Sequence, residues 1–187
     1  MITEEYKKAL LDMHSSAHWG TTGGVYAGDT IVEFIKAYPD IKTILDYGCG
    51  EGALKKWVED SGITDKDWTQ YDPGVAEFSR RPEGRFDLVI TTDVLEHVEE
   101  EHIDDVLDDL NNLTGKYLFN EIACYFARAY FRGGPYKGKD LHISVKAPDH
   151  WMLRLDRSDM RLITSTSCVH LGWKVRYLSI QERKVNE

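Results

Sequence analysis

The chain has 187 residues and a formal net charge of −9, with 32 acidic against 23 basic side chains. This length suits one domain with a substantial core and leaves little room for two. The negative charge argues against a broad basic face that neutralises nucleic-acid phosphates. No apolar run approaches the roughly 18 residues of a membrane span. The first residues do not show the basic and then apolar pattern of a signal peptide. Three dispersed cysteines favour a reducing cytoplasm.

Hydrophobic periodicity and turn residues predict helices and strands that alternate along the chain. Helices are expected over residues 3–14, 26–38, 53–61 and 99–113, and from Pro148 onward. Strands are expected over residues 43–47, 67–71, 86–91, 116–121, 161–169 and 173–182, the last two as a terminal antiparallel hairpin. Residues 75–85 are too few for a full helix and a strand, so the third strand should be reduced or missing. The order predicts an α/β fold with a doubly wound, Rossmann-like, mostly parallel sheet.

A glycine-rich turn follows the first expected strand, where residues 45–52 read LDYGCGEG. Backbone without Cβ atoms can approach a ligand closely there, and the helix that begins next offers unpaired N–H groups. The candidate cofactor-binding residues of this turn are Asp46, Tyr47, Gly48, Cys49 and Gly50. The turn also fits a dinucleotide fingerprint, G-x-G-x-x-A. A carboxylate at Asp46 would repel a pyrophosphate and attract a cationic amino-acid group, which argues against that alternative.

A second motif lies at residues 86–97, where the sequence FDLVITTDVLEH describes a strand that ends in D-V-L-E-H. Together, the D-x-G-x-G-x-G turn and this strand end resemble the class I S-adenosylmethionine-dependent methyltransferases. The resemblance implies S-adenosylmethionine as the cofactor, with Asp93 and Val94 beside its adenosine and methionine parts. It also places His97 near the methionine end. A histidine there could act as a general base, or it could only orient the next helix.

Asp72 ends the second expected strand, 20 positions after Gly52. A carboxylate there can accept hydrogen bonds from both hydroxyls of a ribose, and Pro73 would shape the wall beside the adenine. The alternative is that Asp72 only forms an Asp-Pro-Gly turn. Trp19, in a glycine-rich loop before the core, could form another wall of the cofactor pocket or could pin the N-terminal helix.

The acceptor side is expected to include Glu121, at the end of the strand 116–121, and His142. With His97, these are the candidate catalytic residues. This region also resembles, more loosely, compact methyltransferases commonly encoded by phages. No metal site is predicted, because His14 and His18 lack a third histidine or a carboxylate in an H-E-x-x-H pattern.

We expect a single domain over residues 1–187, with an N-terminal helical cap at 1–38 and a cofactor-binding core at 39–187. The core should carry a lid-like insertion near 124–147. Within it, the aromatic segment 124–131 favours an amphipathic helix, and the loop from Gly133 to His142 is the better candidate for acceptor contact.

The predicted function is methyl transfer from S-adenosylmethionine to a small-molecule or glycan-like acceptor, without a nucleic-acid or membrane partner. Adenine methylation in nucleic acids is disfavoured, because residues 92–95 read TDVL and not N/D-P-P-Y. Two alternatives stay open. One is a sensor or scaffold that binds the cofactor without turnover, and the other is a nicotinamide-dependent oxidoreductase, against which Asp46 argues.

Overall fold

The computed structural model describes residues 3–14 and 25–184. Its helices are α1 (Glu4–His14), α2 (Gly28–Ala37), α3 (Ala53–Asp60), α4 (Ile103–Leu113) and α5 (Pro148–Arg154). Its strands are β1 (Thr43–Tyr47), β2 (Asp67–Tyr71), β3 (Phe86–Thr92), β4 (Thr114–Ala123), β5 (Met160–His170) and β6 (Lys174–Arg183). The helices and strands expected from the sequence are present, with ends that differ by a few residues, except for the helix expected over 124–131.

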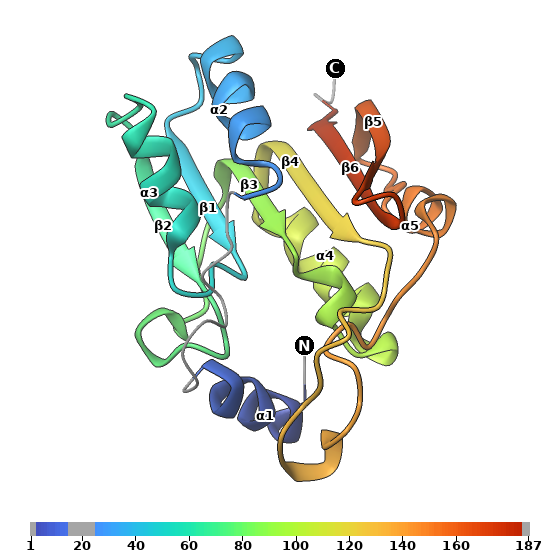
Figure 1. The fold of residues 1–187 in the computed structure, drawn as a ribbon. Coiled ribbons are helices and arrows are strands. Elements are labelled where there is room, and N and C mark those ends of the chain that lie inside the picture. Colours follow the sequence, from blue (N-terminus) through green and yellow to red (C-terminus); the bar gives the residue numbers. More distant parts are fainter. Residues whose placement is uncertain (1–2, 15–24, 185–187) are drawn as a thin grey trace.

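The six strands form one sheet in the order β2-β1-β3-β4-β6-β5 (Figure 1). The first four are parallel to one another, whereas β6 runs antiparallel between β4 and β5. Between β2 and β3 the chain forms only a 3-10 helix, Ala76–Phe78, so the prediction of a missing third strand is confirmed. The chain leaves β1 toward β2 and returns on the other side of β1 as β3. Ligands of doubly wound sheets bind at such a switch point, beyond the carboxyl ends of the strands.

Alternating side chains of the central strands build two cores, one on each face of the sheet. Ile44 and Leu88 pack with the buried stripes of α2 and α3. Their neighbours Leu45 and Val89 point the opposite way, into the core made with α4 and with Trp151 of α5. Because both faces of the central strands β1 and β3 are covered, a site can open only at an edge of the sheet, and the carboxyl edge is the one at the switch point.

The insertion at residues 124–147 contains no α-helix, so the helix predicted for 124–131 is wrong. The reason is a set of backbone hydrogen bonds to one distant side chain. The Asp140 carboxylate accepts the backbone N–H groups of Ala127, Arg128 and His142, each at 2.9 Å. These bonds replace the helical ones, and Arg128 adopts a left-handed φ of 58°. Hydrophobic periodicity does not predict a hydrogen bond from the backbone of residues 127–128 to a carboxylate 12 or 13 positions later.

Helix α1 lies apart from the sheet, against the insertion (Figure 1). Its Tyr6 ring packs at 5.7 Å from Phe131 and 4.9 Å from Tyr136, measured between centroids. The Tyr6 hydroxyl also donates to the backbone carbonyl of His97, and the Tyr136 hydroxyl donates to the Glu99 carboxylate. Helix α1 and the insertion therefore cover the edge of the sheet where the strands end. Among the helices of the described part of the chain, none is long and apolar enough to cross a membrane.

Candidate active site

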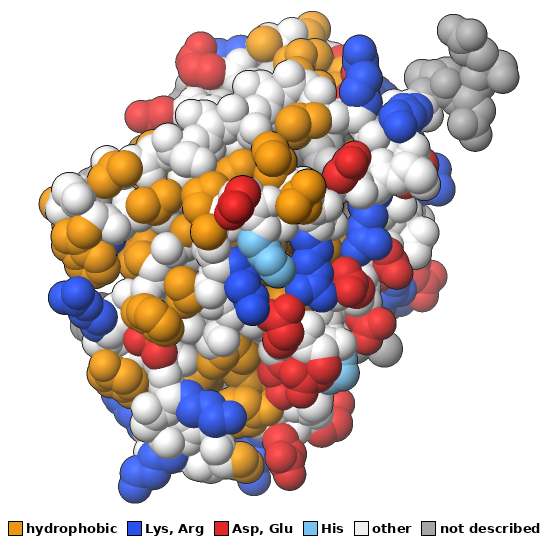
Figure 2. Space-filling view, turned by 90° about the vertical axis from the view of Figure 1, so that its right-hand side faces the viewer, with side chains coloured by type: hydrophobic (Ala, Val, Ile, Leu, Met, Phe, Trp, Pro, Cys, Tyr) orange, Lys and Arg blue, Asp and Glu red, His pale blue; other side chains and the backbone are white. Residues whose placement is uncertain are grey.

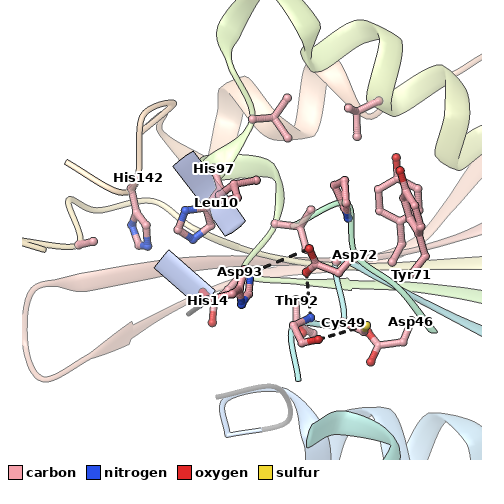
Figure 3. Close-up of a pocket in the computed structure, with 18 of the residues that line it drawn as sticks. Leu10, His14, Asp46, Cys49, Tyr71, Asp72, Thr92, Asp93, His97 and His142 are labelled. Atoms are coloured by element: carbon pink, nitrogen blue, oxygen red, sulfur yellow. Dashed lines mark hydrogen bonds and ion pairs between the residues drawn. The ribbon is translucent and has the colours of Figure 1, made fainter. Parts of the chain in front are cut away.

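A cavity of about 450 Å³ lies between the carboxyl ends of β1, β2 and β3 and the cover made by α1 and the insertion. This volume is within the range of small-molecule sites, roughly 300–1,000 Å³. The residues predicted for the site that line it are Asp46, Tyr47, Gly48, Cys49, Gly50, Asp72, Pro73, Asp93, Val94, His97 and His142. Figure 3 shows several of them around the cavity, with the two histidines at the far end from Asp46. Trp19 lies outside the described residues.

The glycine turn is tied to the end of β2 by its backbone. The N–H groups of Gly48 and Cys49 both donate to the carbonyl of Tyr71, at 2.7 and 3.1 Å. Gly48 has a φ of 79°, which side-chain-bearing residues rarely adopt. A Cβ atom on Gly48 would lie 2.4 Å from Cγ2 of Val94. The turn can therefore hold this shape only with glycine at position 48.

Asp46 brings a buried carboxylate to the cavity. It is 1% exposed, and its Oδ2 atom has no hydrogen-bond partner. Burial, and secondarily the neighbouring Asp72 carboxylate, raise the pKa of Asp46 to about 7. A buried carboxylate is costly unless a hydrogen-bond donor or a cation satisfies it. Asp46 is therefore suited to a cationic ligand group that enters this end of the cavity.

Replacing Asp46 with asparagine should stabilise the ligand-free protein at pH 8. The folded-state pKa lies above the unfolded value of about 3.9, so the cost of ionising Asp46 is present above pH 7 and disappears as the pH falls toward 4. We expect a gain of roughly 2 kcal/mol at pH 8 and a smaller one at pH 5.5. Thermal unfolding of the two proteins at both pH values measures this. An equal effect at both pH values would contradict a buried, ionisable Asp46.

Asp72 holds the same turn from the other side. Its Oδ2 accepts the Gly50 N–H at 2.9 Å, and its Oδ1 accepts the Gly74 N–H at 2.7 Å. His14 of α1 places Nε2 3.9 Å from Oδ1. A carboxylate has about four lone-pair positions. Asp72 therefore orders the turn and keeps capacity for further hydrogen bonds, in contact with the cavity.

His97 and His142 face each other at the other end of the cavity, with ring centroids 4.8 Å apart. The Nδ1 atom of His97 lies 2.8 Å from the carbonyl of Leu141, and that of His142 lies 2.6 Å from the carbonyl of Tyr125. A carbonyl only accepts, so each Nδ1 carries a proton and donates it. Burial lowers the pKa of His97 to about 4, with a smaller contribution from His142, and burial also lowers the pKa of His142. Both rings are thus neutral near pH 7.

Arg176 of β6 is a site residue that sequence reasoning missed. It is 3% exposed and donates from Nη1 to Asp93 Oδ1 at 2.7 Å and to the Glu121 carboxylate. Its Nη2 donates to the Tyr125 hydroxyl at 2.7 Å, and its guanidinium lies 3.5 Å from the ring centroid of Tyr26. An arginine in a terminal hairpin gave no motif signal, because all its partners are distant in sequence.

Glu121, predicted on the acceptor side, is paired with Arg176 and is not among the residues that line the cavity. Burial raises the pKa of Glu121 to about 7, and the Asp93 carboxylate adds to this, while Arg176 opposes it. Tyr136, within the loop expected to contact the acceptor, also lies off the cavity, because its hydroxyl bonds to Glu99. Of that loop, His142 is the residue that reaches the cavity.

Asp93 lies between the end of the cavity that holds the glycine turn and the end that holds the two histidines (Figure 3). It has a left-handed φ of 54°, an uncommon conformation that aspartate tolerates better than most residues. Its backbone N–H donates to the carbonyl of Glu121 at 3.1 Å, and its side chain is held by Arg176. Residues in such conformations cluster at ligand sites, where the surrounding structure holds them.

The fold and the site together define a class I, Rossmann-like domain that binds a cofactor with a cationic amino-acid end. A model of the methyltransferase domain family matches residues 24–163, most of the chain, and the chain therefore belongs to that family. It is a class I methyltransferase, and its cofactor is S-adenosylmethionine. The partnerless Asp46 oxygen and the glycine turn fit this cofactor, because its amino-acid end carries an ammonium group.

Three solved structures illustrate the likeness. The 1,6-didemethyltoxoflavin-N1-methyltransferase from Burkholderia thailandensis, with bound 1,6-didemethyltoxoflavin and S-adenosylhomocysteine, has a TM-score of 0.62 at 16% identity, covering 100% of this chain and 92% of that one. The plantazolicin methyltransferase BpumL in complex with SAH gives 0.61 at 12%, covering 96% of each chain. The magnesium protoporphyrin IX methyltransferase from Synechocystis PCC 6803, with bound SAM, gives 0.55 at 16%, covering 84% and 78%. No curated protein sequence matches the chain.

Proposed function

We propose that this protein transfers a methyl group from S-adenosylmethionine to a small-molecule or glycan-like acceptor. One observation carries the proposal: a single cavity joins the Asp46 carboxylate and the glycine turn to the histidine pair, His97 and His142. The first end suits the cofactor. The second end offers neutral imidazoles that can accept a hydrogen bond or a proton from an acceptor.

At the cofactor end, Asp46 would attract the ammonium group and Asp72 would accept hydrogen bonds from the ribose hydroxyls, with Pro73 beside the adenine. Asp93 and Val94 would contact the adenosine and methionine parts. When bound, the cofactor supplies its sulfonium methyl group, whose carbon bonds to the acceptor lone pair as the S–C electrons return to sulfur. The chain chiefly has to align the two reactants and keep water out.

At the acceptor end, the two histidines would have different roles. His97, with a pKa of about 4, is a weak base, so it would orient an acceptor hydroxyl by hydrogen bonding. His142 is also held as a neutral ring by its bond to the Tyr125 carbonyl, and it is the better candidate to take the acceptor proton. We assign no direct contact to Glu121, which would act by holding Arg176 and, through it, Asp93.

The size and charge of the molecule support a small acceptor. A cavity of about 450 Å³ that also holds the cofactor leaves room for a small molecule or a terminal sugar. On the face beside the terminal hairpin, acidic and basic side chains are interspersed without a continuous basic surface (Figure 2). Such a face does not suit a phosphate backbone.

The free cysteines Cys49, Cys124 and Cys168 support a reducing compartment, the cytoplasm.

We also propose that the chain works as one domain over 1–187. In this arrangement, α1 closes the cofactor-binding core together with the insertion at 124–147. Helix α2, which the predicted cap 1–38 also included, packs on the sheet and belongs with the core predicted for 39–187. The packing of Tyr6 and Met13 of α1 against Phe131 and Leu141 supports the closure by α1. Closure of such a cover excludes water from the transfer.

Replacing Asp72 with alanine should weaken S-adenosylhomocysteine binding by about 1–3 kcal/mol, because the ribose hydroxyls lose a charged acceptor and Gly50 loses its hydrogen bond. Calorimetry of the folded variant measures the loss. As a control, Asp65→Ala removes an exposed carboxylate that pairs with the adjacent Lys66, and it should bind like the parent. Parental affinity in Asp72→Ala would reduce Asp72 to a turn residue.

An acceptor screen tests the function itself. The protein is incubated with methyl-labelled S-adenosylmethionine and separate pools of hydroxyl-bearing small molecules, oligosaccharides, RNA and DNA. We expect label in one of the first two pools and formation of S-adenosylhomocysteine in proportion. Label confined to RNA or DNA would contradict the proposed acceptor class.

A further inference from the structure

Glu96, between Asp93 and His97, is a buried acid that the roles above leave unused. It is fully buried, and its Oε1 accepts the Ala123 N–H at 2.9 Å. Its Oε2 has no hydrogen-bond partner. Among the described residues no ion pair involves Glu96, whereas Asp93 and Glu121 both pair with Arg176. Ionising a buried carboxyl group without a donor or a cation is costly, and a bound cation would remove that cost.

The two histidines of the cavity lie beside the Glu96 carboxylate. A carboxylate oxygen of Glu96 and one ring nitrogen each from His97 and His142 all lie within 4.8 Å of one another. Ligand atoms bound at about 2.0–2.2 Å from a metal lie at most roughly 4.4 Å apart. Small movements of the three side chains would therefore bring them onto one ion.

The hydrogen bonds of both imidazoles are those of metal ligands. Each ring donates its Nδ1 proton to a backbone carbonyl, Leu141 for His97 and Tyr125 for His142. Such a bond fixes the ring and its tautomer and leaves Nε2 as the ligand atom, an arrangement that metal-binding histidines almost always show. Figure 3 shows the two rings side by side at the edge of the cavity.

Backbone contacts hold the two segments that carry these side chains in place. The Ser144 N–H donates to the Glu96 carbonyl at 2.9 Å, and the Ser144 hydroxyl donates to the Val98 carbonyl at 2.5 Å. Ser144 thus joins the segment of His142 to residues 96–98 by two hydrogen bonds. A site supported in this way loses little freedom when it binds an ion.

We propose that Glu96, His97 and His142 bind one divalent first-row transition-metal ion, whose open coordination positions face the cavity and take a hydroxyl oxygen of the methyl acceptor. With the ion bound, both Nε2 atoms are ligands, so the ion replaces the two imidazoles as the group that holds the acceptor hydroxyl. Two imidazoles with one carboxylate favour such an ion over Mg²⁺ or Ca²⁺, which prefer oxygen ligands. No metal site was predicted from the sequence, because His142 follows His97 by 45 positions and the three residues form no local motif. The role toward the acceptor rests on the proposed methyl transfer, whereas metal binding does not.

Titration of the full-length, chelator-treated protein with Mn²⁺, Co²⁺ and Mg²⁺, each in turn, tests the site. Calorimetry gives the stoichiometry and affinity, and visible absorption reports Co²⁺ coordination. We expect one Co²⁺ per chain, and Mg²⁺ binding at least tenfold weaker. Absence of saturable Co²⁺ binding, or tighter binding of Mg²⁺ than of Co²⁺, would overturn the proposal.

Glu96→Gln and His142→Ala identify the ligands. Glutamine keeps the shape of Glu96 and removes a buried charge, so this variant should fold, and its Co²⁺ affinity should fall at least tenfold. His142→Ala should do the same and change the Co²⁺ spectrum. His102→Ala, which removes a ring that pairs with Asp105 outside the cluster, should bind like the parent. Parental affinity in Glu96→Gln and His142→Ala would overturn the assignment.

S-adenosylhomocysteine titrations of the same preparations separate this proposal from the proposed function. A protein that binds S-adenosylhomocysteine but no Co²⁺ contradicts the metal site alone. A protein that binds Co²⁺ but not S-adenosylhomocysteine keeps the metal site and contradicts the proposed function.

Discussion

Replacing Gly48 with valine should abolish S-adenosylhomocysteine binding, with a loss of affinity of at least 100-fold. Gly48 has a φ of 79°, and the first side-chain atom at this position would meet Val94 at 2.4 Å. A branched residue must therefore change the backbone of the turn or displace Val94, and both line the cavity. The cofactor should approach the backbone most closely at this turn, so either change removes the backbone surface that binds it.

A matched pair of alanine variants separates backbone strain from loss of the site. Gly62, after α3, has a φ of 92°, and a Cβ atom there would meet nothing within 4 Å. Gly62→Ala should lower stability by roughly 1–2 kcal/mol, since it puts a side chain at positive φ. Gly48→Ala should cost more, because its Cβ atom also meets Val94. Gly48→Ala should also weaken S-adenosylhomocysteine binding in calorimetry. If the folded Gly48 variants bind like the parent, the turn does not face the cofactor.

Replacing Arg176 with alanine should destabilise the protein by about 3–5 kcal/mol, because it leaves the Glu121 carboxylate buried without its cation. Asp93 and Tyr125 lose hydrogen bonds in the same step. For a chain of this length, the midpoint of thermal unfolding should fall by roughly 10 °C or more. Differential scanning calorimetry at pH 8 measures it. Lysine at this position should restore only part of the loss, since an ammonium cannot make the same forked contacts.

Arg161 provides the control on the same hairpin. It also pairs with a glutamate, Glu182, but at the surface. Because solvent screens exposed ion pairs, Arg161→Ala should leave the unfolding midpoint almost unchanged. Equal effects of the two substitutions would show that burial of the Arg176 cluster does not matter for stability.

The sequence predicted the architecture because the information for it is local. Alternation and helical spacing place the strands and the buried stripe of α4, from Ile103 to Leu113, without knowledge of the partners. The glycine turn and the D-V-L-E-H strand end were predicted for the same reason. Glycine at a position of positive φ and a carboxylate after a strand are features of a few consecutive residues.

The rest of the site depends on contacts between distant residues. Arg176 gains its role only when β6 inserts beside β4, 55 positions after Glu121 in the sequence. The backbone of residues 127–128 is set by the Asp140 carboxylate, which no periodicity reveals. Glu96 has no local sequence signal of burial, because acidic residues follow it along the chain, yet the structure buries it completely. Burial of a polar group depends on the tertiary fold, which local patterns do not record.

Calorimetric titration of the full chain with S-adenosylhomocysteine, and separately with NAD, tests the central claim most directly. If the cavity beside Asp46 is the cofactor site of a methyltransferase, S-adenosylhomocysteine binds one to one with a dissociation constant in the micromolar range or below, about −8 kcal/mol. NAD then gives no saturable heat, because Asp46 repels its pyrophosphate. Saturable binding of NAD with none of S-adenosylhomocysteine would contradict the account.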